Sequence, residues 1–185
     1  MPGVFVTIVD PATKVPLPVG SSGLVLVRGA NVMRGYLGRP DLTGAAMFGE
    51  NYVTGDIGHL DDDGFLYLTD RLSRFAKIGG EMVPHGVVEE HLQACSGRSE
   101  RVVAVCSVPD ERKGERLMVL TTLRAEDVAA VLRAMATRGL PPLFVPRADQ
   151  FVTVDALPVL GSGKLDLRAV KERCLAAAGA TEAGS

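Results

Sequence analysis

The sequence lacks the features of a nucleic-acid-binding, membrane-spanning or secreted protein. Its 20 basic and 22 acidic residues leave a net charge of −2, and no run of Lys and Arg exceeds two residues. Nucleic-acid binding needs a basic stripe or patch, so no nucleic-acid partner is expected. No stretch approaches the roughly 18 apolar residues of a membrane-spanning helix, and the chain does not open with a signal-peptide pattern.

Cysteine is also scarce, which bears on the cellular compartment. Cys95, Cys106 and Cys174 are odd in number, lack CxxC spacing and lie in apolar stretches. Such cysteines favour reduced, buried thiols over a disulfide framework. A cytoplasmic globular protein is therefore expected, and its 46% apolar residues are enough for a substantial core.

Strand patterns dominate the first part of the chain. Residues 4–9 and 24–28 are rich in β-branched and apolar residues, which predicts two strands. Residues 57–60 and 65–68 flank the turn Asp61-Asp62-Asp63-Gly64, so they are expected to form a hairpin. Residues 1–72 are therefore predicted to be an all-β piece.

The second part of the chain alternates between strands and helices. Strands are predicted at 102–108, 117–123 and 151–154, and amphipathic helices at 84–94, 127–137 and 167–177. The predicted fold class is α+β, in which residues 73–185 form a small domain of helices on a three-stranded sheet.

The tripeptide Thr54-Gly55-Asp56 is the first candidate for binding chemistry. A glycine before the aspartate lets the backbone turn tightly and leaves the carboxylate free to accept hydrogen bonds. The two hydroxyls of a ribose match one carboxylate well. The alternative is a turn aspartate that caps its own backbone, and the tripeptide alone favours that alternative.

A basic segment with a glycine pair is the second candidate. Arg71, Arg74 and Lys77 lie within seven residues and are followed by Gly79 and Gly80. The cations could contact phosphate, and the glycines would let a ligand approach bare backbone. A solvated basic strand edge explains the same pattern equally well.

A lysine between glycines is the third candidate. Lys164 lies in Gly161-Ser162-Gly163-Lys164-Leu165-Asp166, where it could reach into a site during a conformational closure. The segment is not a P-loop, because Pro158 stands where that motif needs glycine and Leu165 where it needs Ser or Thr.

The histidines do not suggest a metal site. His59, His85 and His91 lack ligand spacing and are expected at the surface or at its boundary. No Cys/His pair or serine nucleophile motif is visible. The residues alone therefore predict possible nucleotide contacts, one mobile lysine and no metal site.

Taken in order, several segments resemble the adenylate-forming superfamily of acyl-CoA synthetases, luciferases and peptide-synthetase adenylation domains. They are Gly23 to Gly29 with Gly35 to Leu37, Tyr52 to Asp56, Asp70 to Met82, Leu140 to Pro146, and Gly161 to Asp166. Residues 74–83 and 157–164 are most similar to bacterial acyl-[acyl-carrier-protein] synthetases and 2-acylglycerophosphoethanolamine acyltransferases.

The resemblance implies a two-step reaction. A carboxylate, which the resemblance implies is a long-chain fatty acid, would react with ATP to give an acyl-adenylate and pyrophosphate. The acyl group would then pass to the pantetheine thiol of acyl-carrier protein or CoA. Asp56 would bind the ribose hydroxyls of ATP or AMP, Arg71 the ribose-phosphate region, and Lys164 the carboxylate and α-phosphate, where its positive charge would stabilise the developing negative charge.

The resemblance also implies movement between the two steps. Residues 1–72 would be the last, β-barrel-like subdomain of the large AMP-binding domain, and residues 73–185 the mobile small domain. A hinge at Ser73 would let the small domain present Gly79 and Gly80 to the pantetheine thiol, where a side chain would obstruct a narrow tunnel.

The family's phosphate loop, adenine pocket and acyl pocket have no counterpart in residues 1–50. The chain is therefore expected to be a C-terminal fragment that needs an upstream N-terminal domain and is inactive alone. The Mg²⁺ ligands are expected mostly outside it, and the missing part could also bring the protein to the inner face of the membrane.

Two other functions stay open at this point. In the first, the chain is a non-catalytic interaction module whose Arg74 and Lys77, with Arg71, dock an acidic carrier protein. In the second, it is a nucleotide-binding regulator, which would need the fragment itself to bind AMP despite holding only part of a pocket.

Overall fold

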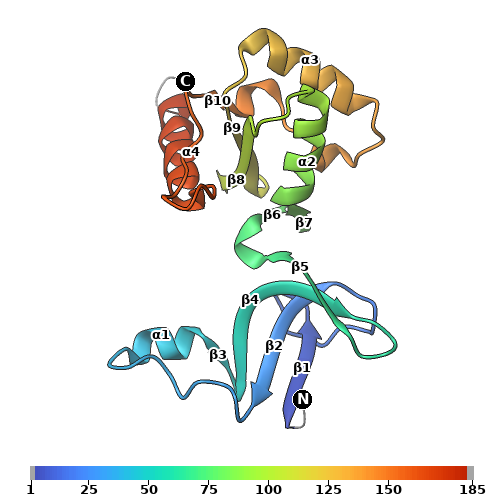
Figure 1. The fold of residues 1–185 in the computed structure, drawn as a ribbon, viewed down its shortest axis with the longest axis vertical. Coiled ribbons are helices and arrows are strands. Elements are labelled where there is room, and N and C mark those ends of the chain that lie inside the picture. The colour runs from blue at the N-terminus through green and yellow to red at the C-terminus, as the bar shows by residue number, and fades with distance from the viewer. Residues whose placement is uncertain (1–2, 183–185) are drawn as a thin grey trace. The chain divides into compact units, whose positions relative to one another are not determined.

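The chain folds into two compact units in a computed structural model, which describes residues 3–182 (Figure 1). Contacts divide the chain into Met1–Ser73 and Arg74–Ser185. This division falls one residue from the boundary predicted from the sequence. The α+β fold class is confirmed, with helices and two separate sheets.

The first unit is an antiparallel sheet. Its strands are β1 (Val4–Val9), β2 (Gly23–Gly29), β3 (Met47–Phe48), β4 (Asn51–Leu60) and β5 (Leu66–Arg71). The order is β1-β2-β4-β3, and β5 also pairs with β4. Ile8, Leu24 and Ile57 are among its buried core residues. The sheet is open among the described residues, since no pairing closes β1 onto β3 or β5.

Local chemistry explains the turns of this unit. The Asp61 carboxylate accepts the backbone N–H groups of Asp63 (3.1 Å) and Phe65 (2.8 Å), which fixes the predicted β4–β5 hairpin turn. The segment after β2, expected to be turn-rich, contains the short helix α1 (Pro40–Ala45). Pro40 suits the first turn of that helix, because proline lacks only an N–H that would have no helical partner there.

The second unit contains a five-stranded sheet rather than the predicted three-stranded one. Its strands are β6 (Phe75–Ile78), β7 (Glu81–Pro84), β8 (Val103–Asp110), β9 (Gly114–Thr121) and β10 (Phe151–Thr153). β9 pairs with antiparallel β8 and with parallel β10, and these are the three predicted strands. The additional β6–β7 hairpin joins β9 through the single pair Ile78–Gly114.

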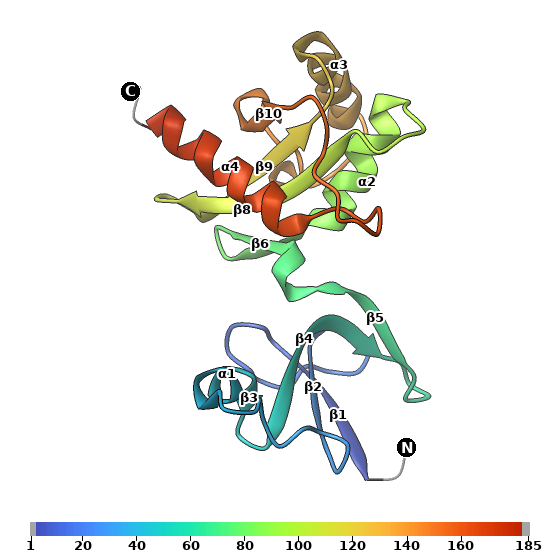
Figure 2. The same ribbon diagram turned by 60° about the vertical axis from the view of Figure 1, so that its left-hand side comes forward.

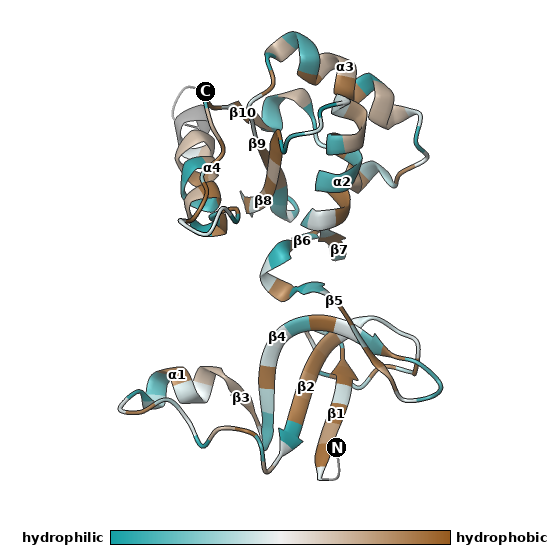
Figure 3. Cartoon of the chain, viewed as in Figure 1, coloured by the Kyte–Doolittle hydropathy of each residue, from teal (hydrophilic) through white to brown (hydrophobic). Residues whose placement is uncertain are grey.

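Helices cover both faces of this sheet (Figure 2). They are α2 (His85–Ser96), α3 (Ala125–Ala136) and α4 (Leu167–Glu182). On β8, Val103 and Val105 pack in the core beneath α2 and α3, whereas Ala104 and Cys106 pack in the core beneath α4. Because both faces are buried, β8 is apolar without alternation, as its colour in Figure 3 shows.

The three predicted helices and most of the predicted strands are present, with ends shifted by a few residues. No helix of residues 3–182 is long and apolar enough to cross a membrane. Cys106 and Cys174 are buried free thiols as expected, and Cys95 is half-buried. Burial and a hydrogen bond to Cys174 raise the pKa of Cys106, which keeps that thiol protonated.

Candidate functional site

The structure brings two predicted nucleotide-binding residues into direct contact. Asp56 on β4 lies opposite Arg71 on β5 in the strand register. Their side chains form an ion pair with 2.6 Å between Arg71 Nε and Asp56 Oδ1. The Arg71 side chain is 65% exposed and that of Asp56 24%. A carboxylate that accepts hydrogen bonds and a guanidinium that donates them therefore lie side by side at the surface of one sheet.

The two residues before Asp56, Thr54 and Gly55, determine the backbone conformation at Asp56. Gly55 has φ +75°, a conformation that side chains disfavour, and it lies in the stretch where the pairing of β4 with β2 is irregular. Thr54 Oγ1 accepts the Asp56 N–H (3.0 Å) and donates to the Val25 carbonyl (2.8 Å). Thr54 thus anchors the strand to β2, and the Asp56 carboxylate does not serve as the turn cap considered from the tripeptide.

Gly79 and Gly80 form the two-residue turn between β6 and β7. Their φ angles are +60° and +92°, the pattern that tight hairpin turns require. A Cβ on either glycine would meet nothing within 4 Å. Backbone conformation is therefore sufficient to explain the glycine pair, and its role toward a thiol stays a prediction.

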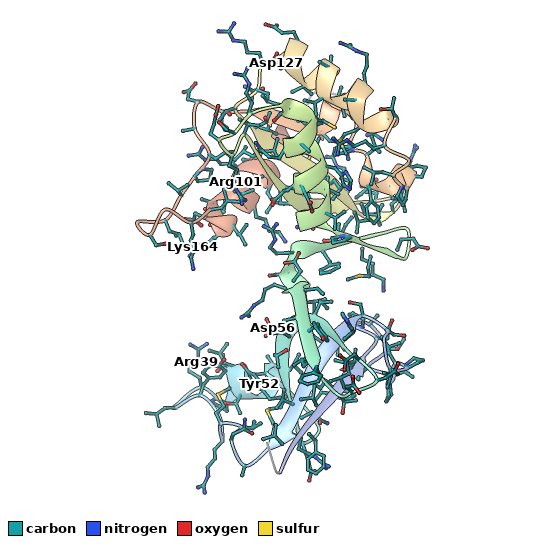
Figure 4. All side chains as sticks on the ribbon, turned by 45° about the vertical axis from the view of Figure 1, so that its right-hand side comes forward. Arg39, Tyr52, Asp56, Arg101, Asp127 and Lys164 are labelled. Carbon is teal, nitrogen blue, oxygen red and sulfur yellow. The ribbon has the colours of Figure 1, made fainter. Side chains whose placement is uncertain are left out.

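Lys164 lies on an exposed turn that is held by backbone hydrogen bonds and a β-bridge. The Leu160 N–H donates to the Lys164 carbonyl (2.7 Å), and the Gly163 N–H donates to the Leu160 carbonyl (2.8 Å). Val159 and Leu165 close the turn as a β-bridge. Within residues 3–182 no ion pair engages the Lys164 ammonium, whose exposed position is visible in Figure 4. This arrangement presents a cation that is available to a ligand.

Arg74 has a structural partner that the sequence did not predict. Its Nη2 lies 2.7 Å from Glu89 Oε2 on α2, and the two side chains are only 16% and 11% exposed. Glu89 Oε1 accepts the Val105 N–H (2.8 Å), and Arg101 lies 3.7 Å from Oε2. Fifteen residues separate Arg74 from Glu89, so no local spacing could reveal the pair. Glu89 thus joins the start of the second unit to α2 and to the edge of β8.

This burial bears on the predicted docking of a carrier protein. Arg74 presents little side-chain surface, whereas Lys77 is exposed. The Lys77 N–H donates to Glu115 Oε2 (2.5 Å), which fixes its backbone and leaves its ammonium outside that contact. Ser73, the predicted hinge, is exposed in the 3₁₀ turn Leu72–Arg74. The hinge role stays a prediction.

The expectation that all three histidines lie at the surface or its boundary is wrong for His85. His85 is 4% exposed, and its Nε2 has no hydrogen-bond partner. Burial, with Arg74 and Lys171 nearby, lowers the pKa of His85 from 6.5 to about 4. Its position at the start of α2, where β7 meets the helix, explains the burial.

This burial predicts a pH dependence of stability. Between about pH 6.5 and pH 4 the unfolded chain binds a proton at His85 that the folded chain does not bind. The free energy of unfolding should therefore be undiminished above pH 6.5 and fall by about 3 kcal/mol as the pH drops to 4. Urea unfolding at several pH values measures this slope, and His85→Leu should flatten it. An unchanged slope in that variant would show that other groups cause it.

Comparison with known proteins finds one family with a similar sequence and solved structures with a similar fold. Residues 88–164 match the family described as AMP-binding enzyme C-terminal domain. The solved structure of ATP-bound MatB from Rhodopseudomonas palustris superposes with a TM-score of 0.71 at 26% identity, covering 94% of this chain and 34% of that one. The sequence similarity to this family thus lies within the second unit, and Lys164 is the last residue of the match.

Two relatives show what this domain accompanies elsewhere. A 3-[(3aS,4S,7aS)-7a-methyl-1,5-dioxo-octahydro-1H-inden-4-yl]propanoyl:CoA ligase of Rhodococcus jostii (strain RHA1) is 39% identical over 161 residues, which are 83% of this chain and 30% of the ligase. A long-chain-fatty-acid–CoA ligase of Bacillus subtilis (strain 168) is 34% identical over 152 residues, 81% of this chain and 26% of the ligase. The chain thus spans about a third or less of these relatives.

Proposed function

We propose that this chain is the C-terminal part of an ATP-dependent acyl-activating ligase. In the first step a carboxylate attacks the α-phosphate of ATP, forming an acyl-adenylate and releasing pyrophosphate. In the second step a pantetheine thiol takes the acyl group and AMP leaves. The observation that carries this proposal is the Asp56–Arg71 pair on one unit together with a free lysine turn on a matched AMP-binding C-terminal domain.

The roles of the residues follow from their chemistry. Asp56 would accept hydrogen bonds from the ribose hydroxyls, and Arg71 would donate to the ribose-phosphate region. Lys164 would place its ammonium beside the reacting carboxylate and α-phosphate, where negative charge concentrates as pyrophosphate leaves. Residues 3–182 contain no cluster of three His, Cys, Asp or Glu that could hold a metal ion. We therefore assign no Mg²⁺ ligand within them.

The acceptor would carry phosphate, and the second unit offers a cationic cavity for it. This cavity, about 290 Å³, is lined by Arg112, Lys113, Arg116 and Arg147, and also by Asp110 and several apolar residues. Both CoA and the phosphopantetheine arm of a carrier protein have a phosphate next to the pantetheine thiol chain. The names of the relatives favour CoA as the acceptor, and the segment 74–83 supports acyl-carrier protein as the alternative.

Substrate assays on the complete enzyme test these assignments directly. We expect thioester formation from a long-chain fatty acid, since one relative is named for that substrate. A bicyclic propanoate, the acid in the name of the other relative, is the competing substrate. Each acid should be offered with CoA and with holo-acyl-carrier protein. If none of the combinations of acid and acceptor releases AMP, the proposed reaction is contradicted.

A non-catalytic docking module is less well supported. That hypothesis used Arg71, Arg74 and Lys77 as one basic surface. Arg71 is paired with Asp56, and Arg74 is largely buried against Glu89. Among residues 3–182, Lys77 is the exposed cation of the set that forms no ion pair, which is a weak basis for recognising an acidic partner.

A substitution at the β6–β7 turn tests the thioester step. Gly80→Leu in the complete enzyme should slow acyl transfer to the thiol at least about tenfold, equivalent to about 1.4 kcal/mol in the barrier, and leave adenylation unchanged. Any side chain at φ +92° is strained, so Gly80→Ala is the matched control for the backbone cost. Separate assays of the two half-reactions give the measurement. Equal effects of Ala and Leu would remove the obstruction argument.

A further inference from the structure

The Gly79-Gly80 turn is held against the segment that leads into β9. The Gly79 N–H donates to the Lys113 carbonyl (2.8 Å). The Asp110 carboxylate fixes that segment in turn, because it accepts the N–H groups of Arg112 (3.0 Å) and Lys113 (2.8 Å). The position of the glycine turn therefore depends on what ties the β6–β7 hairpin to β9.

A side chain supplies a second tie at the point where β6 and β9 separate. The two strands pair only through Ile78 and Gly114 among the described residues. The next antiparallel pair in this register would be Lys77 with Glu115. There the Lys77 N–H donates to the Glu115 side chain, at Oε2 (2.5 Å). A carboxylate thus continues the ladder by one hydrogen bond, and a charged acceptor makes that bond stronger than a neutral one.

The other oxygen of this carboxylate is fixed from β8. Ser107 Oγ donates to Glu115 Oε1 (2.8 Å), and Ser107 is only 4% exposed. Because both of its oxygens are engaged, the half-buried Glu115 side chain has a defined orientation. Glu115 therefore joins the buried strands β8 and β9 to β6, two residues before the first glycine of the turn.

We propose that Glu115 is a positioning residue of the thioester-forming step, acting through β6 on the Gly79-Gly80 turn. This inference rests on the proposed function, because it assumes that the turn faces the pantetheine thiol. A two-stranded hairpin is marginally stable by itself, so its position depends on such ties. Without the carboxylate, the Lys77 N–H loses its acceptor and the hairpin can move relative to β9.

Separate assays of the two half-reactions on the complete enzyme test this role. Glu115→Ala should slow acyl transfer from a preformed adenylate to the thiol about tenfold or more, since misplacing reacting groups by about 1 Å can cost about 100-fold. ATP–pyrophosphate exchange should change little, because Lys164 lies on a different turn. Glu111→Ala is the matched control: Glu111 is exposed in the turn before β9, and its removal should leave both half-reactions intact.

The conservative variant separates position from charge. In Glu115→Gln the amide oxygen can accept the Lys77 N–H and the amide N–H can donate to the Ser107 oxygen, so acyl transfer should stay near the wild-type rate. Unchanged acyl transfer in Glu115→Ala would overturn the proposal. Equal losses in both half-reactions, or a Glu115→Gln enzyme as slow as Glu115→Ala, would overturn it as well. Failure of the wild-type enzyme to form the adenylate or the thioester would instead reject the proposed function, and this inference with it.

The contact itself can be measured on the chain alone, independently of the proposed function. Amide hydrogen exchange followed by NMR reports on the Lys77 N–H. Glu115→Ala should speed its exchange at least about tenfold, the factor expected for one lost hydrogen bond to a charged group. The Val105 N–H, which Glu89 accepts, should exchange as in the wild type, and Glu115→Gln should restore protection at Lys77. Unchanged exchange at Lys77 in Glu115→Ala would overturn the proposal, because the tie to β6 would then not form in solution.

Discussion

Replacing Lys164 with alanine in the complete enzyme should lower the rate of acyl-adenylate formation about 10²- to 10³-fold, the loss expected for one preorganised group that stabilises developing charge. Acyl transfer from a preformed adenylate to the thiol should change little. The expected asymmetry has a structural reason: Lys164 lies at the tip of a turn held by its own backbone hydrogen bonds, so truncation of its side chain disturbs no packing. Pyrophosphate exchange and thioester formation, assayed separately, measure the two steps.

Two variants of the same turn serve as controls for this prediction. Ser162→Ala changes a neighbouring exposed side chain and should leave both half-reactions intact. Lys164→Arg keeps the positive charge but changes its geometry, so it should recover part of the lost rate. If Lys164→Ala lowers both half-reactions equally, the lysine does not act specifically in adenylation.

Replacing Glu89 with alanine should destabilise the second unit by about 3–5 kcal/mol, because it removes the carboxylate that forms an ion pair with the largely buried Arg74 guanidinium. The Val105 N–H at the edge of β8 would also lose its acceptor. Total stabilities are commonly about 5–15 kcal/mol, so this single change could unfold much of the unit. Urea denaturation followed by circular dichroism measures the loss.

Glu90 supplies the matched control for this change. It follows Glu89 on α2 but is exposed, so Glu90→Ala should alter the free energy of unfolding by less than about 0.5 kcal/mol. Glu89→Gln should fall between the two, since the amide oxygen can still accept the Val105 N–H. A loss below about 1 kcal/mol in Glu89→Ala would show that the Arg74–Glu89 pair contributes little to the stability of the second unit.

Much of the fold could be predicted from the sequence because its strands and helices carry strong local patterns. The strand 4–9, the hairpin around Asp61 and the helix beginning near Pro84 follow from apolar periodicity and turn chemistry. The β6–β7 hairpin was not predicted as strands, because its four-residue strands are short and carry charged residues. The short helix α1 lay in a segment whose glycines and polar residues indicate turns.

Only some residues of the candidate site could be predicted from the sequence. Asp56, Arg71 and Lys164 stand in recognisable local motifs, and the structure places Asp56 and Arg71 opposite each other on neighbouring strands. The Arg74–Glu89 pair and the burial of His85 depend on contacts between segments that are apart in sequence. No pattern within a single segment shows that Glu89 faces Arg74.

The most direct test of the central claim is ATP–pyrophosphate exchange with a long-chain fatty acid. The assay compares the chain alone with the chain mixed with a folded upstream region of the same protein. We expect no exchange by the chain alone and exchange on mixing, because the proposed nucleotide and acyl pockets need both parts. Exchange by the chain alone would contradict the partial site described here, and silence of the mixture would contradict the assignment to an acyl-activating ligase.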